Sequence, residues 1–271
     1  MDERPIGVFD SGVGGLTALR ELARLMPGED LIYFGDTGRV PYGSRSRETI
    51  IRYARQDVSF LRTFDLKAIV VACGTVSTIA LDLLASENPL PIFGVVEPAA
   101  EEAVCATKTG RIGLIGTAAT IRSGVFQQRL EAGCPHAAVS AIPCPLFVPL
   151  VENGRFRPED AVVSAVVAEY LAPLKKEGID TLVLGCTHYP LLFDVISRYM
   201  GDGVTLVSSG SACARSVKRH LSAAGACNSR TVGGNRQYFV SDCADDFSAL
   251  ACVFLGEDIA DSAQQIAIED F

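Results

Sequence analysis

Short apolar segments alternate with helical patterns along this chain, and this alternation limits its possible folds more than any other feature. Most segments are followed by a turn and then by apolar residues at helical spacing. Strands that alternate with helices are typical of parallel sheets covered by helices, so we predict an α/β protein. The predicted strands are 5–9, 30–35, 68–73, 91–95, 111–115, 139–143, 182–184, 204–207 and 237–240, followed by a helical tail.

The order of these elements also suggests how the chain divides into domains. Its 271 residues are enough for two domains of ordinary size. A first α/β unit closes at Glu97-Pro98, and the C-terminal stretch returns to it after a second unit. We predict a first domain of residues 1–97 plus 208–271, and a second domain of residues 98–207. Two parallel-sheet domains of this kind would face a shared cleft, a usual site for small ligands.

Two cysteines stand at matching ends of predicted strands. Cys73 is followed by Gly74 and Thr75, and Cys186, 113 residues later, is followed by Thr187 and His188. Either cysteine alone would be read as a small buried hydrophobic residue. As a pair beside hydroxyl and imidazole groups they indicate reactive thiols, because a nearby imidazole can lower the pKa of a thiol. A zinc site would need closer ligand pairs than these, so we expect no metal.

Three other turns after predicted strands carry candidate residues. The glycine-rich turn at 10–15 is not a dinucleotide-binding fingerprint, because its last required glycine falls at Thr17. Asp10 there is either a catalytic carboxylate or a helix cap. In the next turn Tyr42 can close over a ligand, and Gly43 allows close approach of the backbone. Thr117 binds ligand or caps the helix that follows it.

Composition excludes several classes of function. The net charge of −8 and the pI of about 5.0 argue against nucleic acid or an anionic membrane surface as the main partner. The start of the chain is polar and leads directly into a strand, so we expect no signal peptide and no membrane span. The nine cysteines show no paired spacing and should be reduced thiols in the cytoplasm.

Six motifs in order resemble the glutamate racemases of the aspartate/glutamate racemase superfamily. They are GVFDSGVGGLT, YFGDTGRVPYGSRS, VVACGTVST, GLIGTAATI, PLVENG and VLGCTHYPLL. The resemblance implies two pseudo-symmetric domains, usually in a homodimer, that convert glutamate without a cofactor to supply D-glutamate for peptidoglycan. It also implies Cys73 and Cys186 as the two bases, with Asp10 and His188 assisting them. The implied substrate-binding residues are Asp10, Ser11, Tyr42, Gly43, Gly74, Thr75, Thr117, Glu152, Thr187 and His188.

One motif departs from the family's common pattern. The residue after the first cysteine is usually an asparagine, and here it is Gly74, which leaves only a backbone N–H at that corner. We expect Gly74→Asn to keep the enzyme on glutamate, because it restores the usual residue. A pyridoxal cofactor would need a lysine at a strand end, and none of the five lysines lies at one.

The predicted chemistry is removal of the Cα proton on one face and return of a proton on the other. From the superfamily's geometry we expect Cys73 to act on D-glutamate and Cys186 on L-glutamate. Three alternatives stay open. Within the superfamily, aspartate or another acidic amino acid is the second choice of substrate. A hydrolase with Cys186 as nucleophile and His188 as base would leave Cys73 unused. A two-lobed binding protein would leave the Cα proton of its ligand untouched.

Overall fold

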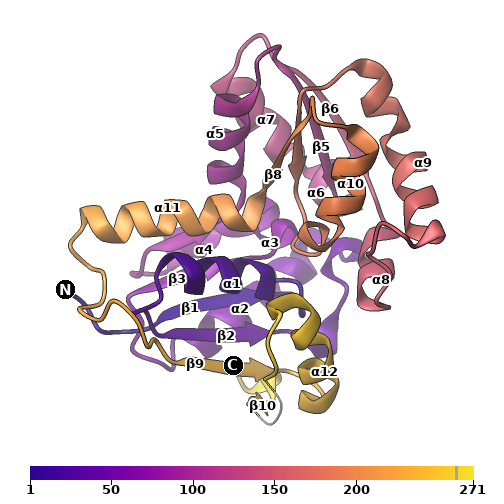
Figure 1. The fold of residues 1–271 in the computed structure, drawn as a ribbon. Coiled ribbons are helices and arrows are strands. Elements are labelled where there is room, and N and C mark those ends of the chain that lie inside the picture. The colour runs from indigo at the N-terminus through magenta and orange to yellow at the C-terminus, as the bar shows by residue number, and fades with distance from the viewer. Residues whose placement is uncertain (260–261) are drawn as a thin grey trace.

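The computed structural model describes residues 1–259 and 262–271 and contains two separate parallel sheets (Figure 1). Both sheets are covered by helices, so the predicted α/β class is confirmed. The first sheet has the order β10 (Ala263–Gln265), β9 (Arg236–Val240), β2 (Leu31–Gly35), β1 (Ile6–Asp10), β3 (Ala68–Val71) and β4 (Ile92–Gly94). The second has the order β6 (Ala138–Pro143), β5 (Arg111–Gly116), β7 (Thr181–Leu184) and β8 (Thr205–Ser208).

The central strands are buried on both faces, as expected where helices cover a parallel sheet. Every residue of β1, β2, β3 and β7 is buried. Their sequences are therefore almost continuously apolar instead of alternating. The strands run in register, with Phe9 beside Phe34 and Val71, and Leu184 beside Ile115 and Ser208. Parallel register brings the turns after β1, β2 and β3 to one edge of the first sheet.

The helices begin and end where local chemistry requires. Helix α9 starts after Asp160, whose carboxylate accepts from the backbone N–H of Val162 and Val163, and ends at Gly178 in the left-handed region (φ 67°). The helices are α1 (Leu16–Leu25), α2 (Arg47–Leu61), α3 (Gly74–Ile79), α4 (Leu81–Glu87), α5 (Val96–Ala106), α6 (Ala118–Ser123), α7 (Val125–Gly133), α8 (Phe147–Glu152), α9 (Ala161–Glu177), α10 (Phe193–Met200), α11 (Ser209–Ala223) and α12 (Ala244–Leu255).

Helix α11 joins the two halves of the molecule. It leaves β8 of the second sheet and packs against α1 of the first half and α5 of the second, as Figure 1 shows. Its buried face includes Gly210, where an added Cβ would lie 3.1 Å from the Cβ of Ala18. Because α11 contacts helices of both halves, its packing does not assign it to one domain. The domain boundaries at 97 and 208 therefore stay a prediction. No helix within the described residues has the length and apolarity needed to cross a membrane.

The C-terminal region differs from the sequence-based expectation. Each predicted strand overlaps an observed one, but the predicted helical tail is only α12, and β10 follows it to pair in parallel with β9. Strand β10 consists of three residues, Ala263–Gln265, with both glutamines exposed. An edge strand this short and polar carries no apolar pattern, so local sequence did not indicate it. Two helices follow Cys73, α3 and α4, and they meet at Ala80.

Candidate active site

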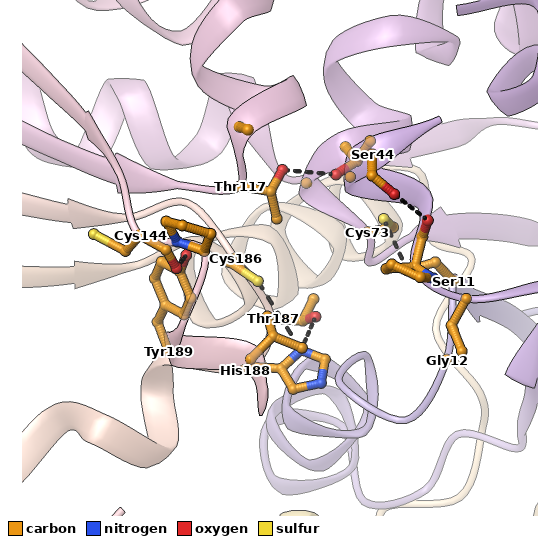
Figure 2. Close-up of a pocket in the computed structure, with 18 of the residues that line it drawn as sticks. Ser11, Gly12, Ser44, Cys73, Thr117, Cys144, Cys186, Thr187, His188 and Tyr189 are labelled. Atoms are coloured by element: carbon orange, nitrogen blue, oxygen red, sulfur yellow. Dashed lines mark hydrogen bonds between the residues drawn. The ribbon is translucent and has the colours of Figure 1, made fainter. Parts of the chain in front are cut away.

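A cavity of about 340 Å³ lies where strand ends from both sheets meet (Figure 2). This volume falls within the range of small-ligand sites. Both predicted thiols line it, and Figure 2 shows them reaching it from different segments of the chain. The sequence-predicted residues that line it are Ser11, Gly43, Cys73, Gly74, Thr75, Thr117, Glu152, Cys186, Thr187 and His188.

Cys73 is held as a protonated thiol on the side of the first sheet. It comes two residues after β3 and immediately before α3. Its Sγ lies 3.5 Å from the Oγ of Ser11 and donates a hydrogen bond to it. Burial raises the pKa of the Cys73 thiol to about 12, and the nearby carboxylate of Asp10 acts in the same direction. This residue therefore keeps its proton near neutral pH and is present as the thiol, not as a thiolate.

Cys186 occupies the matching place in the second sheet, two residues after β7. Its Sγ lies 4.0 Å from Nδ1 of His188, whose Nε2 is 2.9 Å from Oε1 of Glu152. Burial alone would lower the pKa of His188, but its contacts with Cys186 and Glu152 raise it to about 10. The imidazole is thus a cation near neutral pH, and a cation beside a sulfur stabilises the thiolate form.

Asp10 lies behind the cavity instead of on its lining. The residue is buried, and its Oδ2 accepts from the backbone N–H of Gly12 at 3.2 Å. Among the described residues its Oδ1 has no hydrogen-bond partner. Burial raises the pKa of this carboxyl. The alternative that Asp10 caps the following helix is wrong, because α1 has Gly15 at its N-cap position and no side-chain cap.

Three threonine hydroxyls form a connected group between the two halves. Oγ1 of Thr75 lies 3.1 Å from Oγ1 of Thr117, which lies 2.9 Å from Oγ1 of Thr120. Thr117 also caps α6 by accepting from the N–H of Thr120, so the capping alternative holds while Thr117 still lines the cavity. Gly43 approaches the same threonine, since a Cβ added to it would lie 3.1 Å from the Cβ of Thr117. Loop and helix ends therefore meet across the cavity.

Tyr42 does not line the cavity. Its side chain is buried, and its hydroxyl is hydrogen-bonded to the carboxyl groups of Asp36 and Asp57. Its neighbours Gly43 and Ser44 do line the cavity. The expected closure of the Tyr42 ring over a ligand is therefore not how the structure uses this residue.

Some lining residues were not predicted from the sequence. Cys144 lines the cavity, but its thiol donates to the carbonyl of Ile142 at 3.8 Å, and Figure 2 shows it turned away from Cys186. Burial raises the pKa of this thiol well above its ordinary value. Its position directly after β6, at a strand end, is the signal that would have identified it. The other lining residues not predicted are Gly12, Val40, Pro41, Ser44, Ala118, Pro145, Val148, Pro149, Gly185 and Tyr189.

The described lining of the cavity contains few groups that could carry a positive charge. No lysine or arginine is among its described lining residues, and His188 is the one cation-forming group there. Hydroxyls and backbone N–H groups of the turns are the remaining donors. Across residues 1–259 and 262–271, no group of three His, Cys, Asp or Glu side chains is arranged to hold a metal ion.

Comparison with known proteins gives consistent matches. A family model for Asp/Glu/hydantoin racemases matches residues 6–217. The chain is 45% identical to a glutamate racemase from Geobacter metallireducens over 269 residues, which cover 99% of this chain and 98% of the relative. The structure of glutamate racemase isoform RacE1 from Bacillus anthracis is 38% identical, with a TM-score of 0.92 and 98% of each chain covered. That of glutamate racemase from Francisella tularensis, in complex with D-glutamate, is 32% identical, with a TM-score of 0.91 and full coverage of both chains.

Proposed function

This chain belongs to the Asp/Glu/hydantoin racemase family, and on that premise we propose that it interconverts L-glutamate and D-glutamate by two-base proton transfer. It is an isomerase of the amino-acid racemase class. The observation that carries the proposed mechanism is the pair of thiols, Cys73 and Cys186, lining one cavity from two sheets. Racemisation needs a base on one face of Cα and an acid on the other, and two thiols on separate elements meet that need.

The surroundings of the two thiols differ. The thiol of Cys73 keeps its proton, because its pKa is about 12. The sulfur of Cys186 lies 4.0 Å from Nδ1 of His188, an imidazole that can take up or return a proton. In the proposed mechanism Cys186 is the sulfur base and Cys73 the sulfur acid, which is the combination that L-glutamate needs if Cys186 acts on that enantiomer.

The reaction then follows with its protons balanced. The Cys186 thiolate takes the Cα proton of L-glutamate, and Cys73 gives its S–H proton to the opposite face, which yields D-glutamate. Reversal of both transfers converts D-glutamate back. The step leaves a thiolate at Cys73, where burial opposes charge. Asp10 assists there, because its raised pKa favours a protonated carboxyl that can return a proton to the sulfur.

Glutamate would be held mainly by neutral donors. Hydroxyls of Ser11, Thr75, Thr117 and Thr187 line the cavity, and backbone N–H groups of its turns lie between them. Hydrogen bonds from neutral donors to a carboxylate are strengthened by the low dielectric of a buried site. Val40 and Val148 add apolar side chains to the lining of the same cavity.

The proposal extends to the role in the cell. We place the enzyme in the cytoplasm as a homodimer that supplies D-glutamate for peptidoglycan, as the family resemblance implies. Growth of a D-glutamate-requiring bacterium carrying this gene, without added D-glutamate, tests the role. Light scattering on the purified protein tests the dimer.

Solvent-deuterium exchange tests the reaction itself. After dialysis against a chelator, the protein is incubated in heavy water with L-glutamate, D-glutamate or either enantiomer of aspartate. We expect glutamate product to carry deuterium at Cα while unreacted substrate stays largely protiated early on. Exchange with aspartate instead of glutamate would move the assignment to the second substrate. An inert Cα proton together with trapping of an acyl-enzyme at Cys186 would favour the hydrolase.

A further inference from the structure

Beneath the cavity, a buried polar cluster links Asp36, Arg39, Tyr42 and Asp57. Asp36, Tyr42 and Asp57 are almost fully buried. The Arg39 guanidinium donates from Nε to Oδ2 of Asp36 at 2.7 Å and from a terminal nitrogen to Oδ1 of Asp57 at 3.0 Å. The Tyr42 hydroxyl contacts Oδ2 of Asp36 and lies 3.1 Å from Oδ2 of Asp57. None of these side chains lines the cavity, so the reaction as described does not use them.

The two carboxyl groups of the cluster differ in their hydrogen-bond donors. Both oxygens of Asp36 accept: Oδ2 from Arg39 and Tyr42, and Oδ1 from the Ser241 hydroxyl at 2.7 Å. The Ser241 oxygen accepts from the backbone N–H of Gly38 at 2.9 Å, which leaves its hydroxyl proton to be donated to Asp36. Asp36 therefore accepts at both oxygens, from Arg39, Tyr42 and Ser241.

Asp57 meets a different environment at its Oδ2. Tyr42 has one hydroxyl proton for two carboxyl contacts. We assign that proton to Asp36, whose Oδ2 also accepts from Arg39, because Oδ2 of Asp57 contacts only Tyr42 among the hydrogen bonds of the described cluster. Oδ2 of Asp57 then faces the oxygen of Tyr42, and a hydrogen bond between the two needs a proton on Asp57. The opposite oxygen, Oδ1, accepts from Arg39 in the ordinary way.

The charges in the cluster lead to the same assignment. Arg39 supplies one positive charge and Asp36 one negative charge, so an ionised Asp57 would leave a net negative charge in a buried place. Burial of an uncompensated charge is costly, and a carboxyl in that position keeps its proton instead. Burial and the charge of Asp36 indeed raise the pKa of Asp57 well above its ordinary value.

We propose that Asp57 is a neutral carboxylic acid that positions the turn Tyr42–Ser44 at the cavity through the chain Asp57–Tyr42–Asp36. This role rests on the proposed function, because the turn carries Gly43 and Ser44 to the substrate. The Tyr42 side chain points into the cluster while its neighbours face the cavity. Fixing the Tyr42 hydroxyl at two points therefore fixes the backbone that the substrate contacts.

Infrared spectroscopy tests the protonation state without any assay of activity. A protonated carboxyl has a C=O stretching band that ionised carboxylates lack. Near neutral pH we expect the wild-type spectrum minus that of Asp57→Asn to contain this band, while Asp10 contributes equally to both and cancels. Asp202→Asn, at an exposed position, is the matched control and should leave no such band. A difference spectrum of Asp57→Asn without the band would overturn the proposal, whether or not the protein racemises glutamate.

Kinetics of matched variants test the positioning role. In Asp57→Asn the amide N–H₂ replaces the protonated Oδ2 as donor to Tyr42, and the amide oxygen still accepts from Arg39. We expect it to stay within about threefold of wild type in kcat/KM, whereas Asp57→Ala loses about tenfold or more, mainly through a higher KM. Asp36→Asn should lose at least as much kcat/KM as Asp57→Ala, because its amide N–H₂ would face groups that donate hydrogen bonds to Asp36. Equal loss in Asp57→Asn and Asp57→Ala, or a harmless Asp36→Asn, would refute the assignment. If Asp36→Asn does not fold, the two Asp57 variants and the infrared band still decide it.

Discussion

Gly74→Ala tests how closely the two thiol-bearing turns must approach. Gly74 follows Cys73 directly, and Gly185 precedes Cys186 directly, so each of the two thiol-bearing turns contains one of these glycines. A Cβ added to Gly74 would lie 2.4 Å from the carbonyl oxygen of Gly185. Gly74 is not among the glycines with positive φ, so an alanine there meets no backbone strain. Among the described residues, the carbonyl of Gly185 in the opposite turn is what a Cβ at position 74 would approach too closely.

The size of the effect follows from that distance. Ordinary van der Waals contact begins at 3.4 Å, so the two turns must separate by about 1 Å, which is 3.4 minus 2.4. The obstructing atom belongs to the backbone at the end of a buried strand, which cannot rotate away. A misplacement of ~1 Å in an active site can cost about 10²-fold in rate. We expect kcat to fall by about that factor in both directions, because both thiols are displaced relative to Cα.

This expectation reverses the one drawn from the sequence for Gly74→Asn. Asparagine has the same Cβ and additional atoms beyond it, so the structure predicts a loss at least as large as for alanine. The asparagine that is usual in the family cannot be restored here without moving the turn at Gly185. The corner after Cys73 is therefore shaped for glycine in this chain.

Circular dichroism of glutamate solutions follows the rate in each direction, and thermal unfolding of each variant separates misplacement from misfolding. Overpacking of this kind costs about 1–3 kcal/mol of stability, so Gly74→Ala should stay folded at room temperature. Gly203→Ala is the control, because a Cβ there has no atom within 4 Å and its φ is not positive. A folded Gly74→Ala protein with wild-type kcat would refute the reasoning, because it would mean that the turns separate freely without loss.

Three further predictions concern the thiols, the imidazole and the core. Cys73→Ser and Cys186→Ser should each stop racemisation in both directions, with a loss of rate beyond the ~10²–10⁴-fold typical of removing one acid–base group. Cys105→Ser, at an exposed cysteine, should keep full activity. Normal turnover by Cys73→Ser would rule out the two-base mechanism. Glu152→Gln removes one of the contacts that raise the pKa of His188 to about 10. On the alkaline side of the pH–activity profile, activity should therefore decline at a lower pH than in wild type. Glu159→Gln, at an exposed position, should leave the pH of that decline unchanged. Lys67→Met breaks the buried pair of Lys67 and Glu29 and should lower the free energy of unfolding in urea by about 3–5 kcal/mol, against little change for exposed Lys218→Met.

The sequence by itself determined the fold class, the positions along the chain of all the described strands except β10, and the two cysteines that line the cavity. These features are local: a continuous apolar run is a buried strand wherever it lies, and a cysteine just beyond such a run reaches the edge where parallel sheets bind ligands. Cys73 and Cys186 could therefore be identified from short segments of the chain. The weak edge strand β10 could not, because its pairing with β9 holds it in place and its three residues carry no pattern.

Only the tertiary structure decided how those residues are used. Tyr42 is followed by cavity residues in sequence, yet its side chain is held by Asp57, fifteen positions away, and points into the first half of the molecule. Asp10 lies behind the cavity and Cys144 on its wall, because each depends on how its strand end meets the rest of the fold. The contact between Gly74 and Gly185 joins residues 111 positions apart, and whether a side chain fits at 74 depends on a carbonyl that no local pattern reveals. Packing between distant segments sets distances to within an ångström, and the chemistry of this site depends on distances of that size.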